Sequence, residues 1–220
     1  MSAADLRIPR TGLMVPENAK KALSAGGLVL LSSRQGQLGR GRSILFGVAA
    51  LMTDATVVQM VNYGRGLVSI VVDIDTAFRL GLRRMAGRRA GIPENGEYLV
   101  SIEAADCSGT GISAGDRAAT LRAAGGRDAA QDDIVMPGHV MPLLVPGRLT
   151  RESALPTVAH AIVMRSTEYS VVAWCDVLGR DGDVADLNEA SALARELQLP
   201  MAVADDVSTF TDGPGLSRAS

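Results

Sequence analysis

Short apolar runs alternate along the chain with segments whose apolar residues recur at helical spacing. Runs of strand length, several rich in Val, Ile and Leu, predict strands at 28–31, 67–74, 98–104, 140–145, 170–177 and 201–204. Capping residues and helical spacing predict helices at 17–23, 53–60, 75–80, 113–124, 156–165 and 186–197. Stretches with glycine or proline at 32–43, 83–97, 131–142 and 180–183 are typical of loops, and that at 83–97 is expected to be mobile. This alternation predicts an α/β or α+β fold.

The chain shows no internal repeat and no recognisable linker. We therefore expect a single domain over residues 1–207, followed by a disordered tail at 208–220. The chain has 220 residues, of which 47% are hydrophobic, and this is enough to bury a substantial core.

The charge balance does not favour a nucleic-acid partner. The formal net charge is −2, no block of like charge stands out, and aromatic residues are only 3% of the chain. No uninterrupted apolar run reaches the roughly 18 residues of a membrane span, and residues 1–12 lack the apolar core of a signal peptide. We therefore expect a cytoplasmic protein that binds neither nucleic acid nor membrane.

Few residues are available for thiol, imidazole or amine chemistry. Cys107 and Cys175 are expected to be reduced thiols, with a disulfide or a reactive thiol as the alternative. Two histidines make a multi-histidine metal site implausible. Only two lysines, Lys20 and Lys21, could form a Schiff base.

Five segments carry patterns more specific than periodicity. They are GRGLVSI at 64–70, SGTGISAGDRAATLRAA at 108–124, PGHVMPL at 137–143, GRLTR at 147–151, and Cys175-Asp176 followed by DGD at 181–183. From about residue 20 to residue 207, their order and spacing resemble those of the 3,4-dihydroxy-2-butanone 4-phosphate synthase family.

The resemblance implies a mixed sheet flanked by helices, and a homodimer with active sites at or near the subunit interface. It also implies an Mg²⁺-dependent conversion of ribulose 5-phosphate to formate and a four-carbon riboflavin precursor, through enolisation and a skeletal rearrangement.

The sequence departs from the family where the metal is held. The family has an acidic Asp-Arg-Glu-x-Glu-Gly-Asp loop after its first strand, whereas no Asp or Glu lies between Glu17 and Asp54 here. The family's histidine after Leu-Thr-Arg aligns with Ala154 or Leu155. The family's Arg-His, its active-site Cys and its Glu after Cys are replaced by Asn62-Tyr63, Ser69 and Asp176. Because Mg²⁺ prefers hard oxygen ligands, we expect no resident metal and no other cofactor.

Arginines replace carboxylates in the loop at 32–43. Arg34, Arg40 and Arg42 in this glycine-rich segment suit a small anion, since guanidinium groups grip phosphate and carboxylate in bidentate fashion. The alternative is a solvated surface loop freed from its former constraint.

A second candidate anion site lies at the start of the helix at 113–124. Ser108, Thr110 and Ser113 offer hydroxyl groups there, and Asp116 and Arg117 lie in the first helical turn. The alternative is a capping box that serves only the fold. Arg151 matches a family arginine that helps to hold the substrate phosphate, with a surface arginine as the alternative.

Three residues are candidates for acid–base catalysis. Asp176 follows a predicted buried strand, where burial disfavours the charged form of a carboxylate. His139 lies in PGHVMPL, and Tyr63 could donate a proton. The alternatives are a turn-capping Asp, a hydrogen-bonded structural His and a packed Tyr.

These features favour a divergent enzyme with altered, metal-independent acid–base chemistry on a small anionic or carbonyl-bearing substrate, in specialised metabolism. A non-catalytic paralogue that binds a sugar phosphate, a flavin precursor or a protein partner is the alternative. The ordinary Mg²⁺-dependent synthase is the least favoured interpretation.

Overall fold

The computed structural model describes residues 15–34, 41–85, 95–149 and 153–204. Its strands are β1 (Val29–Ser32), β2 (Ser43–Val48), β3 (Ser69–Val72), β4 (Glu97–Tyr98), β5 (Ile102–Ala104), β6 (Ile134–Leu144), β7 (Val172–Asp176) and β8 (Met201–Val203). Its α-helices are α1 (Glu17–Ser24), α2 (Asp54–Gln59), α3 (Ile74–Arg79), α4 (Ala114–Gly125), α5 (Leu155–Ser166) and α6 (Leu187–Glu196). Short 3₁₀ turns lie at Ala49–Leu51 and Gln131–Asp133, and a π-helical turn lies at Met60–Gly64.

The strands form one eight-stranded sheet in the order β4-β6-β3-β7-β2-β1-β8, with β5 paired to β6 outside this path. The β3–β6 and β1–β8 pairs are parallel, and the other pairs are antiparallel. This mixed sheet confirms the α/β prediction. No helix in the described part of the chain is long and apolar enough to cross a membrane.

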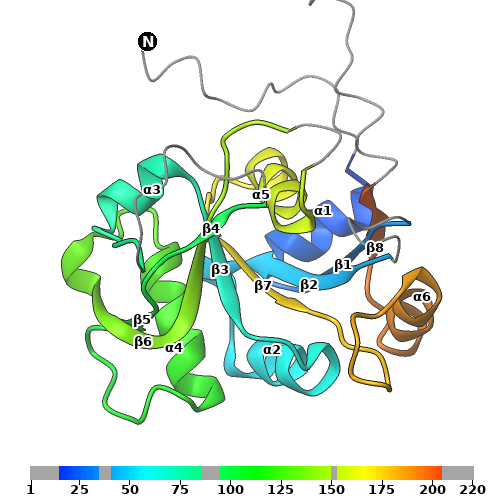
Figure 1. The fold of residues 1–220 in the computed structure, drawn as a ribbon, viewed down its shortest axis with the longest axis horizontal. Coiled ribbons are helices and arrows are strands. Elements are labelled where there is room, and N and C mark those ends of the chain that lie inside the picture. The colour runs from blue at the N-terminus through cyan, green and yellow to red at the C-terminus, as the bar shows by residue number, and fades with distance from the viewer. Residues whose placement is uncertain (1–14, 35–40, 86–94, 150–152, 205–220) are drawn as a thin grey trace, which may run out of the picture.

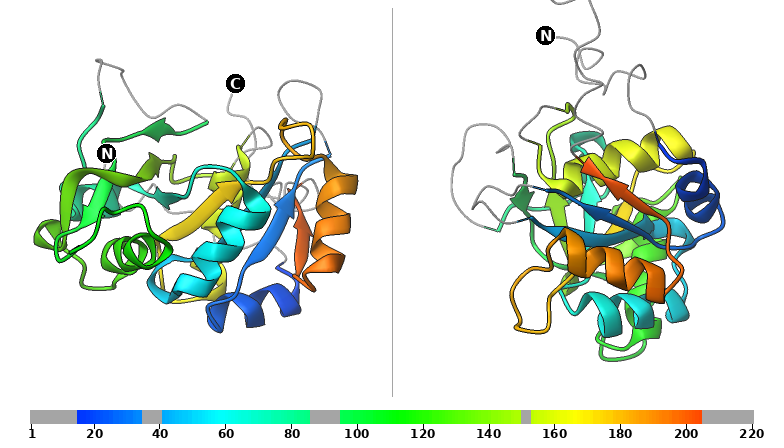
Figure 2. Two further views of the ribbon diagram at one scale, coloured as in Figure 1. Left: turned by 90° about the horizontal axis from the view of Figure 1, so that it is seen from below. Right: turned by 90° about the vertical axis from the view of Figure 1, so that its right-hand side faces the viewer.

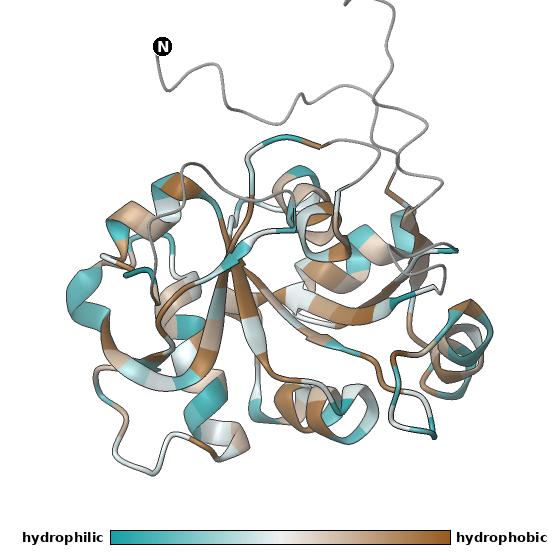
Figure 3. Ribbon diagram, in the orientation of Figure 1, coloured by the Kyte–Doolittle hydropathy of each residue, from teal (hydrophilic) through white to brown (hydrophobic). Residues whose placement is uncertain are grey.

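Helices cover both faces of the sheet (Figures 1 and 2). One buried cluster joins α1 and α5 to one face, and a second joins α2, α4 and α6 to the other. Hydrophobic residues concentrate on the strands and the inner sides of the helices (Figure 3). The alternation of side chains along β7 places Val172 and Trp174 on the α1–α5 face, and Asp176 continues this series at the end of the strand.

Helix starts agree with the capping signals in the sequence. Thr53 forms a reciprocal capping box with Thr56 at α2, and Asp186 forms one with Glu189 at α6. Ser113 accepts a hydrogen bond from the backbone N–H of Asp116 at α4.

The predicted loop at 131–142 is wrong, because most of it belongs to β6. The register between β5 and β6 shifts, so that Ile102 pairs with Val140 whereas Glu103 pairs with Val135. Residues 136–139 therefore form a bulge that absorbs Pro137, whose peptide bond with Met136 is cis. Bulges re-aim side chains, and this one carries His139.

Two further strand predictions need correction. β2 was not predicted, although residues 44–46 are a short apolar run like the one that predicts the strand at 28–31, and all six residues of β2 are buried. The single strand expected at 98–104 is two strands, β4 and β5, which pair with different parts of β6.

Candidate functional site

A bidentate ion pair lies where β2 begins and β7 ends. Arg42 donates from Nε to Asp176 Oδ1 at 2.7 Å and from Nη2 to Asp176 Oδ2 at 2.9 Å. The backbone of Arg42 is fixed on both sides, because its carbonyl accepts from Ser33 N at 2.9 Å and its N–H donates to Ser33 Oγ at 3.3 Å. Both carboxylate oxygens of Asp176 are therefore engaged by one guanidinium.

Two aromatic residues border this pair. The guanidinium carbon of Arg42 lies 5.9 Å from the ring centroid of buried Trp174. The hydrogen bond to Asp176 raises the pKa of Arg42, against the opposing effect of burial. Burial raises the pKa of Tyr98, the nearby Asp176 carboxylate raises it further, and Arg42 opposes this shift. Arg42 is thus firmly cationic at neutral pH.

Two glycines bring the segment after the π-helical turn against β7. A Cβ on Gly64 would meet the Cys175 side chain, and one on Gly66 would lie 2.6 Å from the carbonyl oxygen of Asp176. Tyr63 precedes Gly64 and is partly exposed. The backbone of Tyr63 therefore lies near the Asp176 end of β7, and no hydrogen bond joins its hydroxyl group to another described residue.

His139 belongs to a separate group on the β5–β6 arm. Its Nδ1 lies 2.7 Å from Glu103 Oε2, and the Thr120 hydroxyl donates to Glu103 Oε1 at 2.9 Å. The Glu103 side chain is 11% exposed and that of His139 is 45% exposed. A buried carboxylate thus orients an imidazole that remains open to solvent.

The 108–117 segment packs against this group. Asp116 accepts from the backbone N–H of Gly111 at 3.1 Å, and Ser113 caps α4. Ser108 and Thr110 are exposed, and the Nε of Arg117 is buried without a partner in the described part of the chain. The capping role of Ser113 is present, and the anion-binding role of the segment stays a prediction.

The two groups flank the start of β3, because Ser69 of β3 pairs with both Met141 and Trp174, and His139 and Asp176 each lie two residues beyond these partners. β6 is separated from β7 by β3, and Figure 1 shows the β5–β6 arm with α4 to one side of β3 and the end of β7 on the other. Asp176 pairs with Arg42 and His139 with Glu103, so the structure gives them separate partners. Of the remaining predicted residues, Arg34 is exposed after β1, and Arg40 and Arg151 lie outside the described residues.

The sequence reasoning missed Glu103 and Thr120. A glutamate in the otherwise apolar strand segment LVSIEA was the available signal, because a buried carboxylate needs partners. Arg42 and Asp176 were both candidates, but no sequence signal indicated that they pair, since 134 residues separate them.

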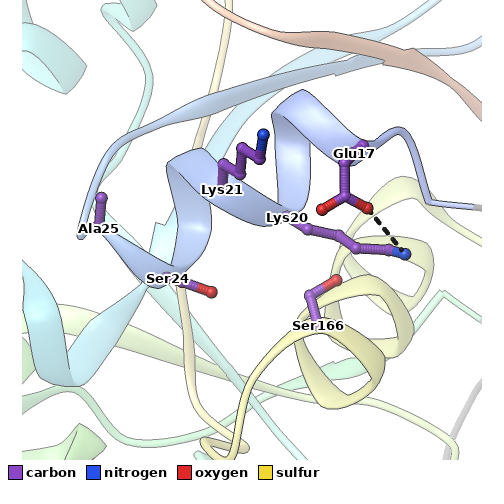
Figure 4. Close-up of a pocket in the computed structure, with 6 residues that line it drawn as sticks. All are labelled: Glu17, Lys20, Lys21, Ser24, Ala25 and Ser166. Atoms are coloured by element: carbon purple, nitrogen blue, oxygen red, sulfur yellow. Dashed lines mark hydrogen bonds and ion pairs between the residues drawn. The ribbon is translucent and has the colours of Figure 1, made fainter.

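A shallow hollow of about 480 Å³ lies between α1 and the end of α5 (Figure 4). Its lining includes Lys20, Lys21, Ser24 and Ser166, and Lys20 pairs with Glu17 at 3.4 Å. None of the predicted site residues lines it.

The family model of 3,4-dihydroxy-2-butanone 4-phosphate synthase matches residues 17–210. The chain belongs to this family. The 3,4-dihydroxy-2-butanone 4-phosphate synthase of Cronobacter sakazakii is 30% identical over 196 residues, covering 88% of each chain. That of Pseudomonas aeruginosa is 40% identical over 139 residues, covering 62% of this chain.

The chain spans 38% of the length of the Pseudomonas aeruginosa protein and 50% of that of a Neisseria meningitidis relative. Among solved structures, the Candida albicans 3,4-dihydroxy-2-butanone 4-phosphate synthase superposes with a TM-score of 0.78 at 22% identity, covering 91% of this chain and all of that one. A synthase structure in complex with two magnesium ions gives a TM-score of 0.72 at 23% identity, covering 86% of this chain and 92% of that one. At these identities the structural likeness shows the synthase fold.

The residues of this chain do not fit the magnesium ion of the family. The loop that is acidic in the family has no carboxylate here, and the Asp176 carboxylate is held by Arg42 on both oxygens. Among the described residues, no three His, Cys, Asp or Glu side chains gather as a set of metal ligands. A guanidinium beside Asp176 also repels a divalent cation.

Proposed function

We propose that this chain is a divergent family member that carries out metal-independent acid–base chemistry on a small anionic or carbonyl-bearing substrate, in specialised metabolism. The Arg42–Asp176 ion pair carries the proposal. It places a fixed positive charge, in a loop without carboxylates, where the family resemblance implies acidic metal ligands. A cation of the protein itself can then balance negative charge on a substrate.

The Glu103–His139 pair supplies the proton-transfer group of this proposal. When Glu103 accepts a hydrogen bond from Nδ1–H of His139, the Nε2 atom is left to take up or release a proton. Thr120 holds the second oxygen of Glu103 and so fixes the orientation of the carboxylate. Glu103 is therefore a positioning residue, and His139 is the group that exchanges protons with the substrate.

The family resemblance also implies a homodimer with active sites at or near the subunit interface. The Glu103–His139 and Arg42–Asp176 pairs lie on either side of the start of β3, so an interface of the kind expected from the family resemblance would cover both groups. Light scattering after gel filtration should then report twice the 22.9 kDa mass of one chain. A monomer at micromolar concentration would contradict this arrangement.

Deuterium exchange with ribulose 5-phosphate in EDTA tests the catalytic proposal. We expect NMR to show metal-independent exchange of the C–H next to the carbonyl, without release of formate. His139→Gln should lower the exchange rate by about 10²-fold or more, as expected for loss of a general acid–base group. The control Glu168→Gln, in an exposed ion pair with Arg127, should leave it unchanged.

Other outcomes separate the competing functions. Formate release that requires Mg²⁺ would show the ordinary synthase and contradict the proposal. Binding of ribulose 5-phosphate without any exchange or turnover would favour the non-catalytic paralogue.

A further inference from the structure

The guanidinium of Arg42 has one edge engaged and another open. A guanidinium carries five N–H donors, arranged along a side edge at Nε and Nη2 and an end edge at Nη1 and Nη2. Asp176 takes the side edge with two hydrogen bonds. For the end edge, no contact with another described residue is recorded. The Arg42 side chain is 38% exposed, so a ligand can approach it from solvent.

Arg42 is held in place before any ligand arrives. Its backbone is bonded to Ser33 on both sides, its side chain is fixed by Asp176, and the ring of Trp174 lies beneath the guanidinium. Most of the side-chain entropy that a ligand would otherwise have to remove is therefore already lost in the folded chain. A flexible surface arginine lacks this advantage.

We propose that the end edge of Arg42 binds an oxyanion, a phosphate or carboxylate group of the ligand, and that Asp176 is a positioning residue that aims the guanidinium at it. This deepens the proposed function, on which it rests, because it names the group by which the small anionic substrate is anchored. It also gives Asp176 a role other than that of an acid–base catalyst.

The Asp176→Asn variant separates two effects of Asp176 on anion binding, its negative charge and its orientation of Arg42, because they predict opposite changes in affinity. If only charge mattered, removing a carboxylate 2.7 Å from the guanidinium would strengthen the binding of an anion. If Asp176 aims Arg42, the variant loses one charge-assisted bond of the bidentate pair and binds the anion more weakly. Glu168→Gln is the matched control, since it makes the same change of net charge in an exposed pair with Arg127.

Calorimetric titration with inorganic phosphate and with acetate, at fixed ionic strength, gives the affinities. We expect the wild type to bind phosphate. Relative to the wild type, the affinity should fall about fivefold in Asp176→Asn and stay within about twofold in Glu168→Gln. Arg42→Lys keeps the charge but loses the planar fork, and should weaken binding about tenfold or more. Phosphate binding alone would indicate a phosphorylated ligand, and binding of both anions would extend the site to carboxylates.

The Nε–H NMR signal of Arg42, identified by its loss in Arg42→Lys, provides a second readout. Phosphate should shift this signal while that of Arg127 stays in place. Equal or tighter phosphate binding by Asp176→Asn would overturn the positioning role. An unperturbed Arg42 signal at tens of millimolar phosphate would overturn the site even if Asp176→Asn failed to fold. Deuterium exchange is measured separately. The anion site on Arg42 can therefore be disproved while the proposed catalysis holds, and the catalysis can be disproved while the anion site holds.

Discussion

The two cysteines differ in environment, and this difference controls their chemistry. Cys175 is fully buried in β7, where burial raises the pKa of its thiol to about 12 and its Sγ donates to the Met60 carbonyl at 3.6 Å. Cys107 is partly exposed. The structure therefore favours a packing role for Cys175 over that of a nucleophile.

Alkylation at pH 8 should modify Cys107 and spare Cys175. A thiol with a pKa of about 12 is ionised in only about one molecule in 10⁴ at this pH, and the thiolate is the reacting form. Mass spectrometry after iodoacetamide should show one added group on the native chain and two in urea. Modification of the native Cys107→Ser variant would refute the prediction.

His160 makes stability depend on pH. Burial in α5 lowers its pKa below the usual 6.5, although the Asp73 carboxylate and the backbone of Ser170 oppose the shift. The unfolded chain then binds a proton more readily than the folded chain. The resulting destabilisation is absent above about pH 7 and grows as the pH falls below 6.5, by at most about 1.4 kcal/mol per pH unit.

Urea unfolding at pH 7.5 and pH 5.0 measures this effect. Wild type should lose more stability between these values than His160→Leu, which has no group to protonate, by at most about 2 kcal/mol. Every other titratable group is the same in both proteins, so the difference isolates His160. An equal loss in the two proteins would show that His160 is not the group responsible.

At the scale of elements, the bulge in β6 and the turn before α4 build the His139 group together. Gly111 has a φ of +78°, and a Cβ at this position would clash with Glu103 and lie 2.5 Å from His139 Nδ1. Only glycine meets both the backbone and the steric requirement. The turn therefore allows Glu103 and His139 to come together.

Gly111→Ala should destabilise the fold by about 2–4 kcal/mol, because steric overlap adds to the cost of a left-handed backbone. Gly182→Ala is the control, since its φ is +85° but nothing lies within 4 Å of an added Cβ. It should cost about 1 kcal/mol. Chemical denaturation gives both values, and an equal cost for the two variants would rule out the steric contribution.

Helices were easier to predict than strands, for a physical reason. A helix start depends on local capping, so Thr53, Ser113 and Asp186 were sufficient signals. β2 and β6 depend on distant partners, and β6 accommodates Pro137 in a bulge that only the register with β5 reveals. The same limit applies to the candidate site, where the sequence indicated Arg42, Asp176 and His139 but neither the Arg42–Asp176 pairing nor the contact between Glu103 and His139.

At the scale of the whole molecule, the synthase fold of this chain carries the Arg42–Asp176 ion pair at the end of β7. The mixed sheet and its two helical layers match those of the solved synthases. At the end of β7, the positive charge beside the Asp176 carboxylate is the guanidinium of Arg42. This chain therefore combines the topology of the synthase fold with a loop before β2 that contains arginines and no carboxylate.

Magnesium should leave the stability of the folded chain unchanged. A site with a Kd of about 0.1 mM would add about 2.7 kcal/mol at 10 mM Mg²⁺, which would raise the Tm of a domain of this size by roughly 5–10 °C. We expect a shift of less than about 1 °C relative to sodium chloride of equal ionic strength. A rise of several degrees in Tm that EDTA reverses would contradict the conclusion that the residues around Asp176 do not fit Mg²⁺.

The hollow between α1 and α5 has a practical consequence for spectroscopy. Lys20 and Lys21, the only lysines in the sequence, both line it, and Lys20 is paired with Glu17 whereas Lys21 has no recorded ion pair among the described residues. Reductive ¹³C-methylation would add isotope labels to these two amines and the chain's amino terminus, leaving every arginine unlabelled. The resulting spectrum would contain a handful of resonances, two of them reporters of how α1 and α5 pack.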